Sequence, residues 1–122
     1  MSFGPEVKAA IVRELEQGER ARNAGNEAQA RVCARRAVGI ALRAFWDEDA
    51  SYTLSVIPLL QRLQETKSLP QSLRNVAEHF LMRVTPEFRL PVDVDLLAEA
   101  RWLVEELERL KSAEAANENQ TD

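Results

Sequence analysis

The only histidine of the chain, His79, closes a six-residue stretch, RNVAEH, that begins with an arginine and an asparagine. A histidine titrates near neutrality, so it can take up and release protons during a reaction. Arg74 can stabilise charge that builds on phosphate oxygens, because its rigid fork of donors matches them. Asn75 can hydrogen-bond a phosphate or orient a neighbouring side chain. The alternative interpretation is a surface arginine and a surface histidine on one helix, with no catalytic role.

A second set of cationic residues lies within NEAQARVCARRAVGIALRAFW, residues 26–46. This stretch carries four arginines between Glu27 and Asp47, with no acid among them. On a helix, the four arginines form a basic strip that is able to contact RNA phosphates. The alternative is that they pair with acids at positions 47–49 and in the last helix. The four residues are Arg31, Arg35, Arg36 and Arg43.

Other patterns that carry chemistry are missing from the sequence. There is no phosphate-binding glycine loop and no serine in a nucleophile elbow, and one cysteine with one histidine is too few for a His/Cys metal cluster. We therefore expect neither a metal nor a cofactor. Cys33 lies between Val32 and Ala34, so we expect a buried small hydrophobic side chain rather than a nucleophile. Three acids of the last helix are expected to form a solvated face: Glu105, Glu106 and Glu108.

Helices are expected to position these residues. In residues 26–46, Asn26 is the expected N-cap after Gly25, and alanines recur at three- and four-residue spacing without an internal proline. These small residues let neighbours approach closely, so we expect this helix to be central. A first helix at residues 4–22, with Pro5 at its start, precedes it across a short turn. The short turn predicts an antiparallel hairpin.

Three further helices are expected at residues 51–66, 70–84 and 96–111. Pro58 lies inside the first of these and is expected to kink it. The segment 85–95 holds two prolines and is expected to be a connector that ends on Asp95, the cap of the last helix. Residues 112–122 are polar, so we expect a disordered tail there. The sequence predicts an all-α antiparallel bundle of about five helices in one domain, residues 1–111.

This pattern resembles the HEPN domains, which are small helical bundles with a long second helix rich in alanine and basic residues, here AQARVCARRAVGIAL. The resemblance covers roughly residues 5–111, and the arginine-to-histidine motif of the family falls on RNVAEH at 74–79. It implies a metal-independent ribonuclease in which two protomers bring Arg74, Asn75 and His79 together at a composite dimer site. On one regular helix, a separation of five residues places Arg74 and His79 about 140° apart.

Charge and length set further bounds. The chain has 122 residues and a net charge of −4. Residues 1–46 carry a net charge of +3 and residues 47–122 a net charge of −7. We expect the two halves to pair their charges within or between protomers. No apolar run is long enough for a membrane span, and the N-terminus lacks the pattern of a secretory signal, so a cytoplasmic location is expected.

Two functions are consistent with the sequence. The first is an RNA-cleaving or RNA-binding module. The resemblance to HEPN domains implies that such a module could be the toxin-like half of a two-protein system. The second is a non-catalytic dimeric helical protein that binds a partner protein or a nucleotide. Both include a homodimer, because the broad apolar arc on residues 26–46 suggests apolar surface left over after folding. The larger aromatic residues are expected to anchor the core or an interface rather than stack on bases: Trp46, Tyr52 and Trp102.

Overall fold

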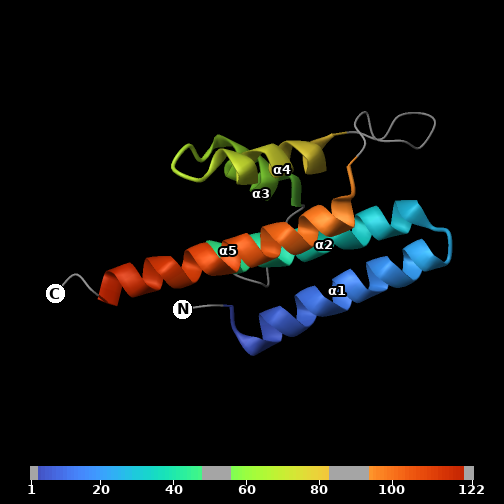
Figure 1. The fold of residues 1–122 in the computed structure, drawn as a ribbon, viewed down its shortest axis with the longest axis horizontal. Helices are drawn as coiled ribbons and strands as arrows, with labels where there is room; N and C mark the ends of the chain where they lie inside the picture. Colours follow the sequence, from blue (N-terminus) through green and yellow to red (C-terminus); the bar gives the residue numbers. More distant parts are fainter. Residues whose placement is uncertain (1–2, 48–55, 83–93, 120–122) are drawn as a thin grey trace.

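The computed structural model of the chain describes residues 3–47, 56–82 and 94–119. In this part of the chain there is no strand, and the predicted all-α fold with five helices is confirmed. The two long helices of the N-terminal hairpin lie beside the last helix, and the two short helices cover the other side of the bundle (Figure 1). The helices are α1 (Pro5–Asn23), α2 (Glu27–Phe45), α3 (Val56–Glu65), α4 (Gln71–Leu81) and α5 (Leu96–Asn119).

Helix α2 is the central element, as predicted, because it packs against α1, α3 and α5. The alanine face expected from the sequence is fully buried, and Cys33 is buried beside it. Small side chains on this face let three helices approach one backbone closely, which increases the packing contacts that stabilise the bundle. The buried alanines are Ala30, Ala34, Ala37 and Ala41.

The turn between α1 and α2 has the geometry that its sequence requires. Gly25 adopts a φ of +82°, a left-handed conformation that residues with a Cβ adopt at a cost. The Asn26 side chain accepts a hydrogen bond of 3.1 Å from the backbone N–H of Gln29, which confirms the predicted N-cap. A Cβ on Gly18 would lie 2.6 Å from Leu97 Cδ2, so a glycine there allows α1 to pack closely on α5.

A cluster around Arg22 fastens this turn to the start of α5. Arg22 donates to Glu27 at 2.8 Å and to the two carboxylate oxygens of Asp95 at 2.9 and 3.1 Å. The hydrogen bond from Arg22 is the main reason that the pKa of Asp95 lies below its usual range. Asp95 also accepts a hydrogen bond from the backbone N–H of Ala98, which confirms it as the cap of α5.

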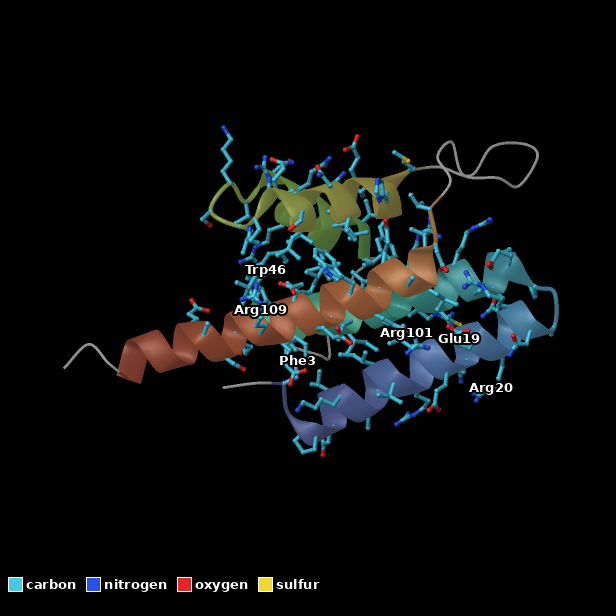
Figure 2. The ribbon with its side chains drawn as sticks, in the orientation of Figure 1. Phe3, Glu19, Arg20, Trp46, Arg101 and Arg109 are labelled. Atoms are coloured by element: carbon cyan, nitrogen blue, oxygen red, sulfur yellow. The ribbon has the colours of Figure 1, made fainter. Side chains whose placement is uncertain are left out.

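Other ion pairs join the basic and acidic halves of the chain. Lys8 of α1 pairs with Glu108 of α5 at 2.9 Å. Glu19 and Arg101 pair with the opposite polarity between the same two helices, at 3.3 Å (Figure 2). These side chains are partly or largely exposed, so each pair contributes about 0–1 kcal/mol. The expected pairing of charges between the halves is therefore present, and it orients α1 on α5 more than it stabilises the fold.

The boundaries differ from the prediction at two helix ends. Helix α4 ends at Leu81, before the predicted residue 84, because Met82 has an extended backbone. Helix α5 continues to Asn119, through most of the segment for which we expect a disordered tail. That segment is rich in alanine and glutamate and contains no glycine or proline, so nothing in it stops a helix.

The third helix contains the proline that we expected to kink it. Pro58 is the third described residue of α3, and the carbonyl four residues before it lies outside the described residues, so the expected kink is not tested. The predicted caps of this helix at Ser51 or Thr53, and the connector up to residue 93, lie outside the described residues. None of the described helices is long and apolar enough to cross a membrane.

Candidate functional site

Arg74 of α4 holds the end of α3. Its Nε donates to the backbone oxygen of Gln64 at 3.0 Å, and a terminal nitrogen donates to the side chain of Gln71 at the same distance. Gln64 lies in the last turn of α3, where carbonyl groups lack helical partners and a cation is favoured by the helix dipole. Asn75 accepts a hydrogen bond of 2.9 Å from Gln71. In one chain, Arg74 and Asn75 thus organise the α3–α4 hairpin.

His79 faces another helix. Its Nδ1 lies 2.9 Å from both carboxylate oxygens of Glu99 in α5, and about a quarter of each side chain is exposed. A carboxylate beside Nδ1 favours the tautomer with the proton on that nitrogen, which leaves Nε2 as an acceptor. The sequence analysis missed Glu99, because no spacing rule connects two helices separated by a connector.

The structure does not bring Arg74 and His79 together within one chain. Arg74 contacts the end of α3 and His79 contacts α5, which agrees with the wide angle that separates these positions on a regular helix. No hydrogen bond joins the two side chains within the described ranges. A site that uses both residues therefore requires a second copy of the chain, as the resemblance implies.

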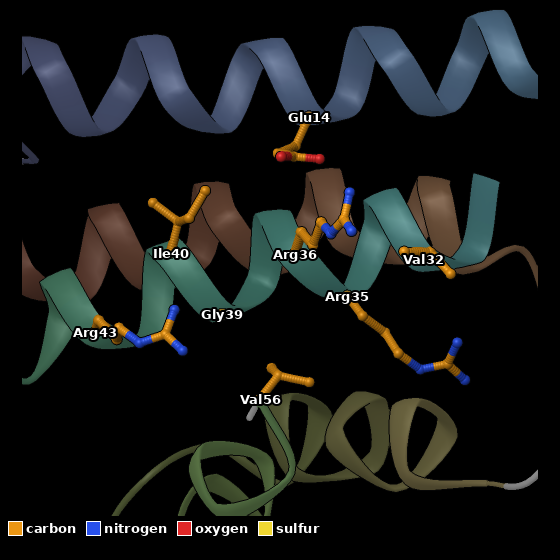
Figure 3. A pocket seen from close by; sticks show the side chains of 8 residues that line it. All are labelled: Glu14, Val32, Arg35, Arg36, Gly39, Ile40, Arg43 and Val56. Carbon is orange, nitrogen blue, oxygen red and sulfur yellow. The ribbon is translucent and has the colours of Figure 1, made fainter. Parts of the chain in front are cut away.

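Three of the four α2 arginines line one pocket, with Arg36 directed toward α1 and Arg35 toward α4 (Figure 3). Arg35, Arg36 and Arg43 line an open pocket of about 400 Å³ between α1, α2 and the start of α3 (Figure 3). The helical spacing explains this arrangement, since Arg36 and Arg43 are seven residues apart, about two turns, and Arg35 directly precedes Arg36 on the side of α2 away from the alanine face. We call this site the α2 pocket; its other described lining residues are Glu14, Val32, Gly39, Ile40 and Val56.

Gly39 forms part of the floor of the α2 pocket. A Cβ at this position would lie 3.3 Å from Val56 Cγ2 and 3.5 Å from a terminal nitrogen of Arg43. The missing side chain therefore lets Val56 approach the α2 backbone, while the Arg43 guanidinium lies at ordinary contact distance from the same position (Figure 3). The sequence analysis noted the glycine as a small residue but had no signal for its role in shaping a pocket.

Arg35 is half-buried and lies between helices. Its Nε donates to the backbone oxygen of Phe80, in the last turn of α4, at 3.4 Å. Burial lowers the pKa of Arg35, and the charge of the neighbouring Arg31 lowers it further. The charged form of Arg35 is therefore disfavoured by its surroundings, and an anion placed beside it would favour that form. Arg31 itself is not among the lining residues of the α2 pocket.

Arg36 and Glu14 face each other across the pocket. Figure 3 shows Glu14 reaching from α1 toward α2 and the Arg36 side chain directed toward α1. Arg36 is exposed and makes no hydrogen bond or ion pair with a residue that the structure describes. Oε2 of Glu14 is shielded from solvent and has no hydrogen-bond partner among those residues. The pocket thus combines a free cationic group with an unsatisfied carboxylate oxygen.

The alternative for the α2 arginines was pairing with nearby acids. In the part of the chain that is described, several of these acids have other partners, and neither Arg35 nor Arg36 makes an ion pair with them. Residues 48 and 49 lie outside the described residues. The observed pairs are Glu99–His79, Glu106–Arg109, Glu108–Lys8 and Asp47–Lys111.

Of the aromatic residues that we expect to act as anchors, Trp46 packs against the core, whereas Trp102 does not. Trp46 is half-buried, meets Phe45 edge to face and lies under the Arg62 guanidinium, 4.1 Å from the ring centre. Trp102 stands off the buried face of α5 and is 37% exposed. Tyr52 lies outside the described residues. Within 3–47, 56–82 and 94–119, no group of three or more His, Cys, Asp or Glu side chains is placed to bind a metal ion.

Comparison of the chain with protein-family models, with curated proteins and with solved structures finds no match. The resemblance to HEPN domains therefore stays a prediction that rests on the pattern of residues 5–111 and on the motif at 74–79.

Proposed function

We propose that the protein binds RNA through the α2 pocket. The observation that carries this proposal is that Arg35, Arg36 and Arg43 all line one open cavity of about 400 Å³. Guanidinium groups donate two parallel hydrogen bonds to phosphate oxygens, which makes arginine suited to phosphate recognition. Three of them around one cavity can contact successive phosphates of a single strand.

Electrostatics supports a polyanionic ligand. Burial and the charge of the neighbouring Arg31 both lower the pKa of Arg35, so an anionic group placed beside Arg35 would stabilise its charged form. Arg36 has no acidic partner among the described residues. Since the whole chain has a net charge of −4, attraction of RNA must come from this local surface rather than from the protein as a whole.

The shape of the pocket supports a single strand. Its opening leaves room for a chain to pass, and the apolar side chains of Val32 and Ile40 offer a surface for an unstacked base. Arginine planes can also stack on bases in single-stranded RNA. A duplex would instead need a wider basic surface, and the neighbouring α1 carries the acids Glu16 and Glu19.

The test is charge reversal at Arg36. In fluorescence anisotropy with a labelled single-stranded RNA, Arg36→Glu should lower affinity about tenfold or more, because it removes a phosphate contact and adds repulsion. Arg20→Glu is the matched control, since Arg20 is exposed on α1 and lies outside the α2 pocket. An equal loss of RNA affinity in both variants would show that only the net charge of the protein matters. No loss of affinity in either variant would favour the alternative function, a dimeric protein that binds a partner protein.

RNA cleavage is a second candidate function, and the contact between His79 and Glu99 favours it. A carboxylate that orients a histidine and leaves Nε2 as a proton acceptor is an arrangement suited to general acid–base catalysis. Arg74 would then come from a second copy of the chain and stabilise charge on the phosphate. The proton transfers need no metal, so cleavage should persist in EDTA.

Cleavage has its own test. His79→Ala should abolish cleavage of single-stranded RNA, and Glu99→Gln should reduce it by about 10²- to 10⁴-fold, because the histidine loses its orienting carboxylate. Sedimentation at the assay concentration should show a dimer. A cleaving monomer, or cleavage that survives His79→Ala, would exclude the composite site, and a wild-type protein that binds RNA without cleaving it would leave binding as the function.

A further inference from the structure

Glu14 is the acid among the described residues that line the α2 pocket. Its Oε2 is screened from water and has no hydrogen-bond partner among the residues described. Buried polar atoms in folded proteins nearly always have a partner, so this oxygen lacks a donor that it can gain from a ligand. For a ligand in the pocket to reach this oxygen, the carboxylate must turn toward the pocket, which requires rotation only about the last bonds of a flexible side chain.

The opposed charges of the α2 pocket restrict what can fill it. A ligand must place an anionic group against Arg36 and Arg43 and N–H donors against Glu14. Val32 and Ile40 lie on either side of Arg36 along α2 and add apolar side chains that a base ring can contact (Figure 3). The volume of about 400 Å³ lies in the range of ordinary small-ligand sites. A nucleotide supplies all three groups: an anionic phosphate, a flat base ring and N–H donors on the edge of the base.

Guanine is the base that matches a carboxylate. Its Watson–Crick edge carries two adjacent donors, N1–H and the N2 amino group, which two carboxylate oxygens can accept side by side. Adenine and cytosine place an acceptor nitrogen beside their amino group, and uracil places carbonyl oxygens on both sides of its N–H, so each sets an acceptor against the carboxylate. Single-stranded RNA exposes this edge for reading.

We infer that the α2 pocket recognises a guanosine phosphate unit, with the phosphate on Arg36 and Arg43 and the guanine edge on Glu14. This inference rests on the proposed function, because it assigns base specificity to the same RNA site. It requires that Glu14 remain available. If Arg36 turns instead to pair with Glu14, the carboxylate is occupied and the site has no preference among bases.

A nucleobase exchange tests the inference with the wild-type protein. The probe is a labelled uridine oligonucleotide of about twelve residues that carries one central guanosine, inosine or adenosine. Inosine differs from guanosine only by the missing N2 amino group. The guanosine probe should bind about fivefold more tightly than the inosine probe and about tenfold more tightly than the adenosine probe. Equal affinity for all three would overturn the inference.

A pair of variants assigns the preference to Glu14. Glu14→Gln replaces one carboxylate oxygen with an amino group that faces the guanine donors, so it should remove the guanosine preference. Glu16→Gln makes the same change of charge on an exposed position of α1 that is not part of the pocket, and it should keep the preference. Loss of the preference in both variants, or in neither, would overturn the role of Glu14.

The same assay separates this inference from the proposed function. Absence of binding to every oligonucleotide would contradict RNA binding itself, whereas binding without a guanosine preference would contradict the inference alone. Competition with free GMP and IMP distinguishes the source of the ligand. Displacement by GMP at about fivefold lower concentration than IMP indicates that a free guanine nucleotide suffices. A guanosine preference that GMP does not disturb indicates that the RNA chain is needed.

Discussion

Arg36 and Arg74 are the same residue type on two helices of one bundle, but their surroundings differ. Arg74 donates to a backbone oxygen of α3 and to the side chain of Gln71, so its guanidinium is used within the fold. Arg36 makes no hydrogen bond to a described residue and lines an open pocket. Arg74, which belongs to the more recognisable sequence motif, therefore has the more structural role. An arginine whose N–H donors are not used within the fold is the better candidate for binding a ligand.

The two regions also differ in how each is completed. The α2 pocket gathers its three arginines and Glu14 within one chain. In the motif at residues 74–79, His79 lies against Glu99 of α5, whereas Arg74 contacts the end of α3. A site that combines Arg74 with His79 would therefore need a second copy of the chain. The RNA binding that we propose would thus need only the monomer, whereas the proposed cleavage would need a dimer.

The largest difference is expected when the two arginines are each changed to alanine. Arg74→Ala should lower the free energy of unfolding by about 1–2 kcal/mol, because the carbonyl of Gln64 loses its donor, and should leave RNA affinity within about twofold. Arg36→Ala should instead lower RNA affinity and change the free energy of unfolding by no more than about 0.5 kcal/mol. Urea denaturation and anisotropy measure both quantities. Parallel effects in the two variants would contradict the distinction between them.

Asp95 provides a smaller effect that concerns the fold alone. Asp95→Asn keeps a capping side chain but removes the ion pair with Arg22, so stability at neutral pH should fall by about 0.5 kcal/mol. The folded-state pKa of Asp95 is lowered, so its contribution is present above the unfolded-state pKa of about 3.9 and is lost as the pH falls through the lower folded-state value. The wild type and the variant should therefore converge in stability in acid. A constant difference at all pH values would contradict this account, and RNA affinity at neutral pH should not change.

The smallest effect is expected at the floor of the pocket. Gly39→Ala introduces a methyl group 3.3 Å from Val56 Cγ2, so Val56 must shift by a few tenths of an ångström, whereas the 3.5 Å to Arg43 is an ordinary van der Waals contact. Higher helix propensity of alanine offsets part of the crowding, so stability should change by less than about 1 kcal/mol. RNA affinity should change by less than about twofold, because the added methyl group leaves Arg43 in place. A loss of tenfold or more would contradict this description of the pocket floor.

The sequence predicted what depends on local pattern. Asn26, Gly25 and Asp95 were identified because caps and left-handed turns depend on residues within one turn of the helix. The buried alanine face of α2 followed from helical periodicity. The lower accuracy at the ends of α4 and α5 has a local cause too, since no strong stop signal marks either end.

What the sequence did not predict lies between helices. The contact of His79 with Glu99, the hydrogen bond from Arg74 to Gln64 and the position of Glu14 opposite Arg36 depend on how separate helices pack. Periodicity assigns a residue to a face of its own helix but does not say which neighbour covers that face. The sequence predicted the four arginines of α2 as one set of binding residues. Only the packing of α1 and α3 around α2 shows that three of them line the pocket and that Arg31 does not.

The central claim is that α2 arginines contact RNA phosphates in one pocket, and the salt dependence of binding tests it most directly. Each phosphate contact contributes about −0.7 to the slope of log affinity against log salt for a single strand, so up to three contacts predict a slope near −2 for the wild type. Arg36→Gln should make the slope shallower by about 0.7, whereas Arg20→Gln should leave it unchanged. Identical slopes for the wild type and Arg36→Gln would contradict the claim.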